Sequence, residues 1–153
     1  MSKACADDLS LDVWKARMRD LQKDCVASVP REQAARIRDA AHLLGRSELH
    51  AVGCAPVSIR MADLEAMLEA SAFESAVLHL MGGEAAFMLS RGGNGSCLAT
   101  VVQPDGAEEM IAEGATPALA LLAAHLAALA EDAGADCIVS DPGPAKASSI
   151  RLN

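Results

Sequence analysis

The sequence predicts an α+β protein, in which an antiparallel three- to four-stranded meander is sandwiched by helices and preceded by an N-terminal helical hairpin. Three observations predict this class. Residues 115–130 carry no charge and fit one buried helix. Two segments near the N-terminus have apolar residues at helical spacing. Short apolar segments between residues 74 and 112 are separated by glycine-rich turns, as in a meander.

The central helix is predicted from its ends and its composition. Thr116 is a good N-cap, and Pro117 fits the first helical position because its missing N–H needs no partner there. Leucines recur on one face, and alanines fill most of the remainder. A helix that is apolar all round is buried on more than one side. A membrane span needs about 20 apolar residues, so this shorter segment does not indicate a membrane protein.

The N-terminal hairpin is predicted from two amphipathic segments, about 10–27 and 30–44, which Val29-Pro30 separates. The apolar face of the first is Leu11, Trp14, Met18, Leu21 and Cys25; that of the second is Ala34, Ile37, Ala41 and Leu44. Residues 46–57 fit either a short strand or a helical turn.

A third helix is expected from residue 59 to about 72, capped by Ser58. Four strands are then expected at about 74–81, 84–91, 96–103 and 108–112, with an optional edge strand at 136–140. Both faces of these strands are largely apolar, so helices or a second subunit are expected to cover both. The predicted organisation is a hairpin and connector (1–57), a sandwich (58–140) and a flexible tail (141–153).

Charge is unevenly distributed along the chain, whose net charge is −8. Residues 1–60 hold ten Lys and Arg against eight Asp and Glu, a net of +2; residues 61–153 hold three against thirteen, a net of −10. Glu108, Glu109 and Glu113 form a candidate acidic partner surface. Phosphate contacts need cations, so the acidic half is a poor nucleic-acid surface. Five widely spaced cysteines without a CxxC pair, and no signal peptide, predict free thiols in the cytoplasm.

Catalytic and metal motifs are not found. His79 and Glu84, placed across the first predicted hairpin, are the best acid/base pair, but an ordinary strand histidine explains His79 better. His125 fits a buried, hydrogen-bonded histidine, and His50 with Cys54 lacks a second pair for zinc. We therefore expect no catalytic residues, no cofactor, no metal and no enzymatic activity.

One short pattern suggests DNA binding. Residues 53–60 resemble the turn and recognition-helix start of helix-turn-helix proteins, for which Arg36, Arg38, Arg46, Ser58 and Arg60 are the candidate DNA contacts. Asp63, Glu65 and Glu69 follow on the helix that would enter the groove, and they oppose phosphate binding. A helix-turn-helix regulator is therefore the alternative function.

Residues 58–131, above all Glu108–Leu129, resemble small phage and prophage proteins with an α-β-α sandwich, which are mostly of unknown function. The similar features are an acidic strand, a Thr-Pro cap and an Ala/Leu helix. The resemblance implies no site residues. We expect a non-enzymatic binding protein, encoded by a phage or mobile element. It would act through protein–protein contacts on host nucleic-acid-handling or defence machinery, and would itself form a dimer.

Overall fold

A computed structural model describes residues 11–45, 59–104 and 108–135. Its elements, in chain order, are α1 (Leu11–Ala27), the 3₁₀ turn η1 (Pro30–Glu32), α2 (Gln33–Leu44), α3 (Met61–Glu69), α4 (Phe73–Met81), β1 (Ala86–Arg91), β2 (Cys97–Val102), β3 (Met110–Gly114) and α5 (Pro117–Ala135). The α+β class, the N-terminal helical pair and a three-stranded antiparallel meander are confirmed. No helix of the described part is long and apolar enough to cross a bilayer.

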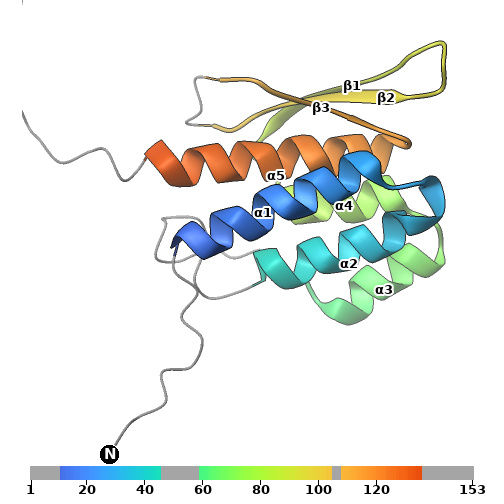
Figure 1. The fold of residues 1–153 in the computed structure, drawn as a ribbon. Helices are drawn as coiled ribbons and strands as arrows, with labels where there is room; N and C mark the ends of the chain where they lie inside the picture. The colour runs from blue at the N-terminus through green and yellow to red at the C-terminus, as the bar shows by residue number, and fades with distance from the viewer. Residues whose placement is uncertain (1–10, 46–58, 105–107, 136–153) are drawn as a thin grey trace, which may run out of the picture.

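The sheet has the order β1-β2-β3, and both pairings are antiparallel. Figure 1 shows the sheet as the upper layer, with α5 running directly beneath it and α1 and α4 beside α5. Helices α2 and α3 lie farthest from the sheet. The molecule is therefore a sheet on a multi-helix base, with α5 between them.

Helix α5 is the centre of the core, as the uncharged sequence predicts. Every residue from Ala118 to Ala128 is buried. The Thr116 hydroxyl caps the helix by accepting a hydrogen bond from the Leu119 N–H at 3.2 Å, and it donates to Gln33 Oε1 at 3.0 Å. The predicted cap is confirmed, and the cap also links α5 to α2.

The N-terminal hairpin shares this core. Trp14, Met18 and Cys25 of α1 are buried in one cluster with the leucines of α5. The Trp14 indole N–H donates to the Leu43 carbonyl of α2 at 3.5 Å. Because these side chains are buried mainly against α5, the hairpin and the sheet region form one hydrophobic unit.

Close packing of β3 on α5 depends on a glycine at the end of the strand. A Cβ added to Gly114 would lie 2.4 Å from the Ala120 backbone nitrogen and 2.9 Å from the carbonyl carbon of Leu119. The missing side chain thus allows strand and helix backbones to approach directly.

The predicted first strand, 74–81, is wrong: these residues belong to helix α4. Ala76, Val77 and Leu80 are buried while Leu78 and His79 are exposed, which is a helical face and not an alternation. Gly82, with φ of +75°, follows the helix, so Gly82-Gly83 is a helix-to-strand connection instead of a hairpin turn. In so short a segment the apolar residues fit both the helical period and the alternation of a strand. Packing against α2, α3 and α5 selects the helix.

The start of the third helix also differs from the prediction. Arg60 occupies the N-cap position of α3, with no side-chain cap, so the predicted cap at Ser58 is wrong. Residues 46–58, the expected strand at 136–140 and the expected tail at 141–153 lie outside the described residues.

Candidate interaction surface

The face of the sheet that points away from α5 carries apolar side chains and no described helix. Along β2, Cys97, Ala99 and Val101 are buried, whereas Leu98 is exposed. The register places Met88, Thr100 and Ile111 side by side on that outer face. Met88 is 74 % exposed, Ile111 58 % and Leu98 39 %. The expected helical cover of both faces is therefore seen on one face only in the described part of the chain.

Acidic residues border this outer face. Glu113 lies opposite Leu98 in the β2–β3 pairing, so its carboxylate shares the face with the apolar residues. Glu108 and Glu109 are exposed immediately before β3. The predicted acidic surface thus lies next to an apolar one, an association that the sequence analysis missed. We call Met88, Leu98, Ile111 and Glu113 the open face.

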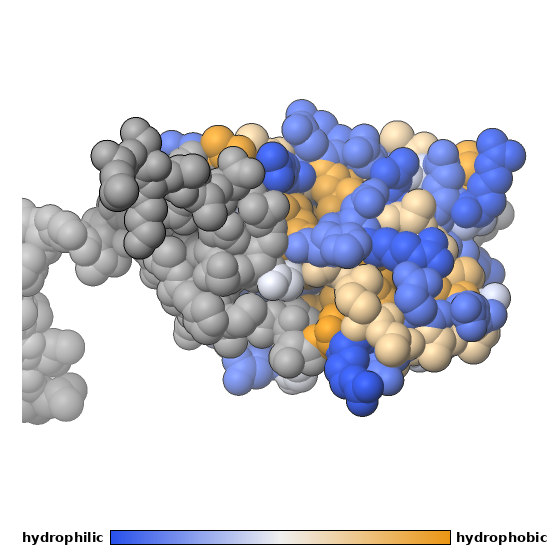
Figure 2. Space-filling view, turned by 90° about the horizontal axis from the view of Figure 1, so that it is seen from below, coloured by the Kyte–Doolittle hydropathy of each residue, from blue (hydrophilic) through white to orange (hydrophobic). Residues whose placement is uncertain are grey.

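The opposite side of the molecule has a different character. Figure 2, which views the protein from below, shows hydrophilic residues interspersed with apolar ones over the described helical side. Hydrophilic side chains lie between the apolar ones on that side.

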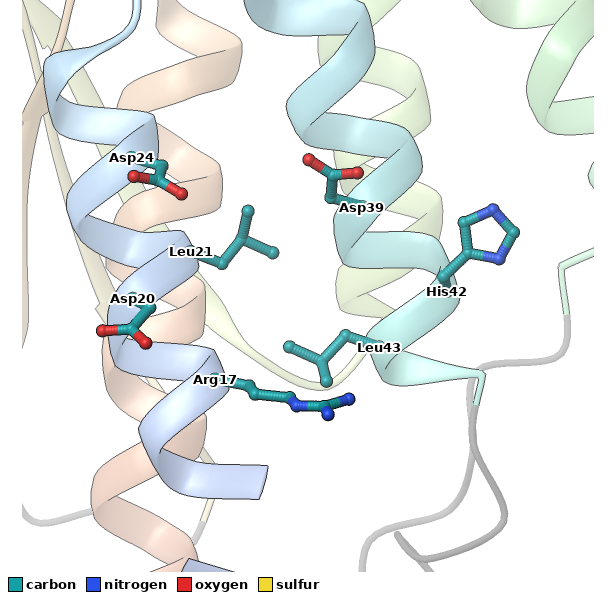
Figure 3. A pocket seen from close by; sticks show the side chains of 7 residues that line it. All are labelled: Arg17, Asp20, Leu21, Asp24, Asp39, His42 and Leu43. Carbon is teal, nitrogen blue, oxygen red and sulfur yellow. The ribbon is translucent and has the colours of Figure 1, made fainter. Parts of the chain in front are cut away.

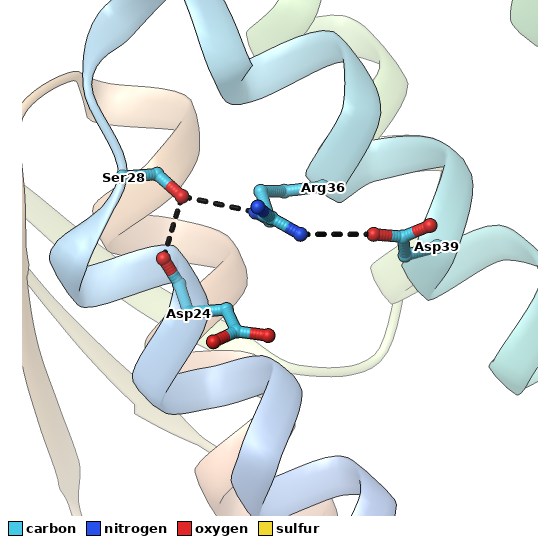
Figure 4. A network of polar contacts seen from close by, with 4 residues as sticks. All are labelled: Asp24, Ser28, Arg36 and Asp39. Atoms are coloured by element: carbon cyan, nitrogen blue, oxygen red, sulfur yellow. Dashed lines mark hydrogen bonds and ion pairs between the residues drawn. The ribbon is translucent and has the colours of Figure 1, made fainter.

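Of the arginines predicted to contact DNA, Arg36 and Arg38 are paired within the protein, whereas Arg60 is exposed. Figure 4 shows that the Arg36 Nε donates to Ser28 Oγ at 3.0 Å, and that its Nη1 donates to Asp39 at 3.1 Å. Ser28 is buried and donates in turn to the Asp24 carbonyl at 2.5 Å. Arg36 therefore joins α1 to α2 and is not displayed for a ligand.

Arg38 binds Glu65 of α3 through two hydrogen bonds of 2.7 and 2.9 Å. The hydrogen bonds from Arg38 hold the pKa of the Glu65 carboxyl below its usual range and raise the pKa of Arg38. Arg60 is exposed at the start of α3, while Arg46 and Ser58 lie outside the described residues. The candidate DNA contacts are thus not assembled into one basic surface in the described part.

A cavity of about 330 Å³ lies between α1 and α2. Figure 3 shows Arg17, Asp20, Leu21 and Asp24 from α1 lining it, with Asp39, His42 and Leu43 from α2. Its charged groups are three carboxylates and one guanidinium, and Asp39 is already paired with Arg36. Among the described residues, no cluster of three or more His, Cys, Asp and Glu is arranged to hold a metal ion.

The candidate acid/base groups do not form a site. His79 is exposed on the last turn of α4 and Glu84 on the connection to β1, so the hairpin expected to join them is absent. His125 is buried in α5, and its Nδ1 lies 3.4 Å from Gln103 Nε2. Burial lowers the pKa of His125 to about 4 and raises the pKa of the Cys25 thiol to about 12. Both groups are therefore neutral and enclosed near pH 7.

Comparisons with protein-family models, with curated proteins and with solved structures found no match to this chain.

Proposed function

We propose that this chain is a non-enzymatic binding protein whose open face contacts another protein. The observation that carries the proposal is the apolar centre of that face, Met88, Ile111 and Leu98, on the side of the sheet that no described element covers. Exposed apolar patches rimmed by polar residues are typical of protein-binding surfaces.

The size of the apolar centre indicates what else the partner must supply. The three exposed fractions together equal less than two whole side chains. Burying them contributes about 3–5 kcal/mol, because full burial of one such side chain contributes about 1.5–3 kcal/mol. Association costs about 4–15 kcal/mol in lost rigid-body freedom, so burial of this patch alone leaves little or no net affinity for a partner.

The acidic residues around the open face determine which kind of partner it can select. Glu113 shares the open face, and Glu108 and Glu109 precede the same strand. Arg91 is the only Lys or Arg between residues 61 and 135, so the strands and their connections carry mainly negative charge. The partner that fits is a protein with an apolar patch bordered by Lys or Arg, such as the basic groove of a nucleic-acid-handling protein.

The resemblance to phage and prophage proteins supports a source in a phage or mobile element, with a host protein as the partner. An acidic, partly apolar surface would occupy a basic groove that otherwise holds nucleic acid. The support for this origin, and for a role against host defence, is the sequence resemblance of residues 58–131.

The test is capture from nuclease-treated host lysate by three forms of the chain. Wild type is compared with the face variant Met88→Lys and with the control variant Met61→Lys, which places the same change on an exposed methionine of α3. We expect one host protein to be retained by wild type and Met61→Lys, released by salt, and lost in Met88→Lys.

Equal capture by all three forms, or no capture, contradicts the proposal. Salt-sensitive binding of duplex DNA that is lost in Arg60→Glu would instead support the helix-turn-helix alternative.

A further inference from the structure

Within the described residues, strand β1 forms one edge of the sheet, because β2 is its single neighbour in the order β1-β2-β3. Its backbone groups alternate in direction. The Gly92 N–H donates to the Ser96 carbonyl at 2.9 Å, just beyond the paired strands. Hydrogen-bonded pairs recur at every second residue of an antiparallel ladder, so Ser90 and Met88 also direct their N–H and C=O groups toward β2. Phe87, Leu89 and Arg91 therefore direct theirs toward the open edge.

This edge lacks the features that keep strands from pairing. Strand β1 contains no proline, and its one charged residue, Arg91, stands at the end of the strand. The other edge strand, β3, contains Glu113, follows Glu108 and Glu109, and is contacted by α1. A second copy docking on β3 would bring like charges together, so charge directs association to β1.

The apolar side chains along this edge are also only partly buried. The register with β2 puts Phe87 opposite Val101 and Leu89 opposite Ala99, on the side that faces the helices. Nevertheless Phe87 is 44 % exposed and Leu89 40 % exposed. The helices cover β2 and β3 more fully than β1, which leaves an apolar margin along the same edge as the available backbone groups.

We propose that β1 pairs antiparallel with β1 of a second copy, about a two-fold axis at Leu89. This register is the one that uses all three residues whose backbone groups face the edge. Leu89 then lies opposite Leu89 of the second copy, and Phe87 lies opposite Arg91 in both directions. The result is a continuous six-stranded sheet.

Self-complementarity identifies a second copy as the occupant, in preference to an unrelated strand. Phe87 and Arg91 are each two residues from Leu89, so a two-fold axis brings each one to the other. Arginine over an aromatic face is favourable, and the leucine pair completes an apolar centre. The same operation places the two open faces on one side of the enlarged sheet.

The small size of the β1 edge limits the expected stability of the dimer. Six strand residues span about 20 Å, and such an edge buries less than the roughly 800 Å² per partner of a standard interface. We therefore expect a dimer that dissociates on dilution. The inference does not depend on the proposed function, because it uses the edge of β1 and not the open face.

Sedimentation velocity of the full chain across a concentration series tests the pairing. The wild-type mass should rise from that of one chain, 15.8 kDa, toward two chains. Leu89→Lys should remain a single chain over the same range, with at least a roughly 10-fold weaker association. Met88→Lys, on the outer face of the same strand, should behave as wild type while losing the host partner.

A wild-type chain that stays single throughout overturns the proposal. So does the reverse pattern, in which Met88→Lys abolishes the dimer and Leu89→Lys keeps it, because that pattern means face-to-face packing.

Cysteine cross-linking tests the register without relying on a charged substitution. Leu89→Cys should form an intermolecular disulfide under mild oxidation, since directly opposite Cα atoms lie about 5.5 Å apart. Ser90→Cys is the matched control, because its opposite residue in the second copy is Met88 and the two cysteines are offset along the strands. Both variants are made with serine at Cys5, Cys54 and Cys137. Absent cross-linking at position 89, or preferential cross-linking at 90, contradicts the register.

Discussion

Replacing Gly114 with alanine is a sharp test of how β3 packs on α5. The added Cβ would lie 2.4 Å from the Ala120 nitrogen, 2.9 Å from the Ala120 Cα and 2.9 Å from the Leu119 carbonyl carbon. All three neighbours are backbone atoms of the helix and cannot rotate away as a side chain can. Either the strand or the first turn of α5 must therefore shift.

The expected cost follows from two opposing effects. Overpacking a close-packed site costs about 1–3 kcal/mol, and a distance this short places Gly114→Ala at the upper end. Replacing glycine lowers the entropy of the unfolded chain and returns about 0.4–1 kcal/mol. We expect the free energy of unfolding to fall by about 2 kcal/mol, and the melting temperature by about 4–8 °C for a chain of this size.

Urea denaturation followed by the fluorescence of Trp14 measures this change, since Trp14 is the only tryptophan and is buried. Gly83→Ala is the matched control: nothing lies within 4 Å of its added Cβ. That variant should be within about 0.5 kcal/mol of wild type or slightly more stable. If Gly114→Ala is as stable as Gly83→Ala, the close contact between β3 and α5 is refuted.

Three further predictions concern single side chains. His125 stays neutral in the folded protein because burial lowers its pKa from 6.5 to about 4. In the unfolded chain His125 takes up a proton below about pH 6.5. The free energy of unfolding therefore has its full value above that pH and decreases as the pH falls toward 4. Urea denaturation should show a loss of about 2 kcal/mol between pH 7 and 5, which His125→Leu should largely abolish; an equal loss in that variant would contradict the assignment. Thr116→Val removes the acceptor for the Leu119 N–H and should cost about 1 kcal/mol in the same assay, and an unchanged midpoint would exclude the cap. Arg38→Met should raise the pKa of the Glu65 carboxyl toward its ordinary value in an NMR titration, because both hydrogen bonds are lost; an unmoved pKa would show that the pair does not form in solution.

How far the sequence predicts this fold depends on whether a pattern is local. The first helix, with Trp14, Met18 and Cys25 at helical spacing, and the strands β1 and β2 were predicted within a few residues. The cap at Thr116 was also predicted, because capping involves neighbouring residues alone. The pairing of Arg38 with Glu65 was not predicted, since the two residues are 27 positions apart and no local pattern specifies such pairs. The pairing of Arg36 with Asp39, three residues along the same helix, is local, but the assignment of Arg36 to DNA contact overlooked it.

By itself, the sequence determined the buried helix α5, because an uncharged Leu/Ala segment has no side that gains from contact with water. Tertiary structure decided two things. Residues 73–81 form a helix because this conformation places Ala76, Val77 and Leu80 together in the core. The sequence pattern of the same residues is also compatible with a β-strand. The described helices pack on one side of the sheet and leave Met88 and Ile111 exposed to water on the other. Which face of a sheet is covered depends on the elements that pack against it in three dimensions, and the residue pattern of a strand does not specify this.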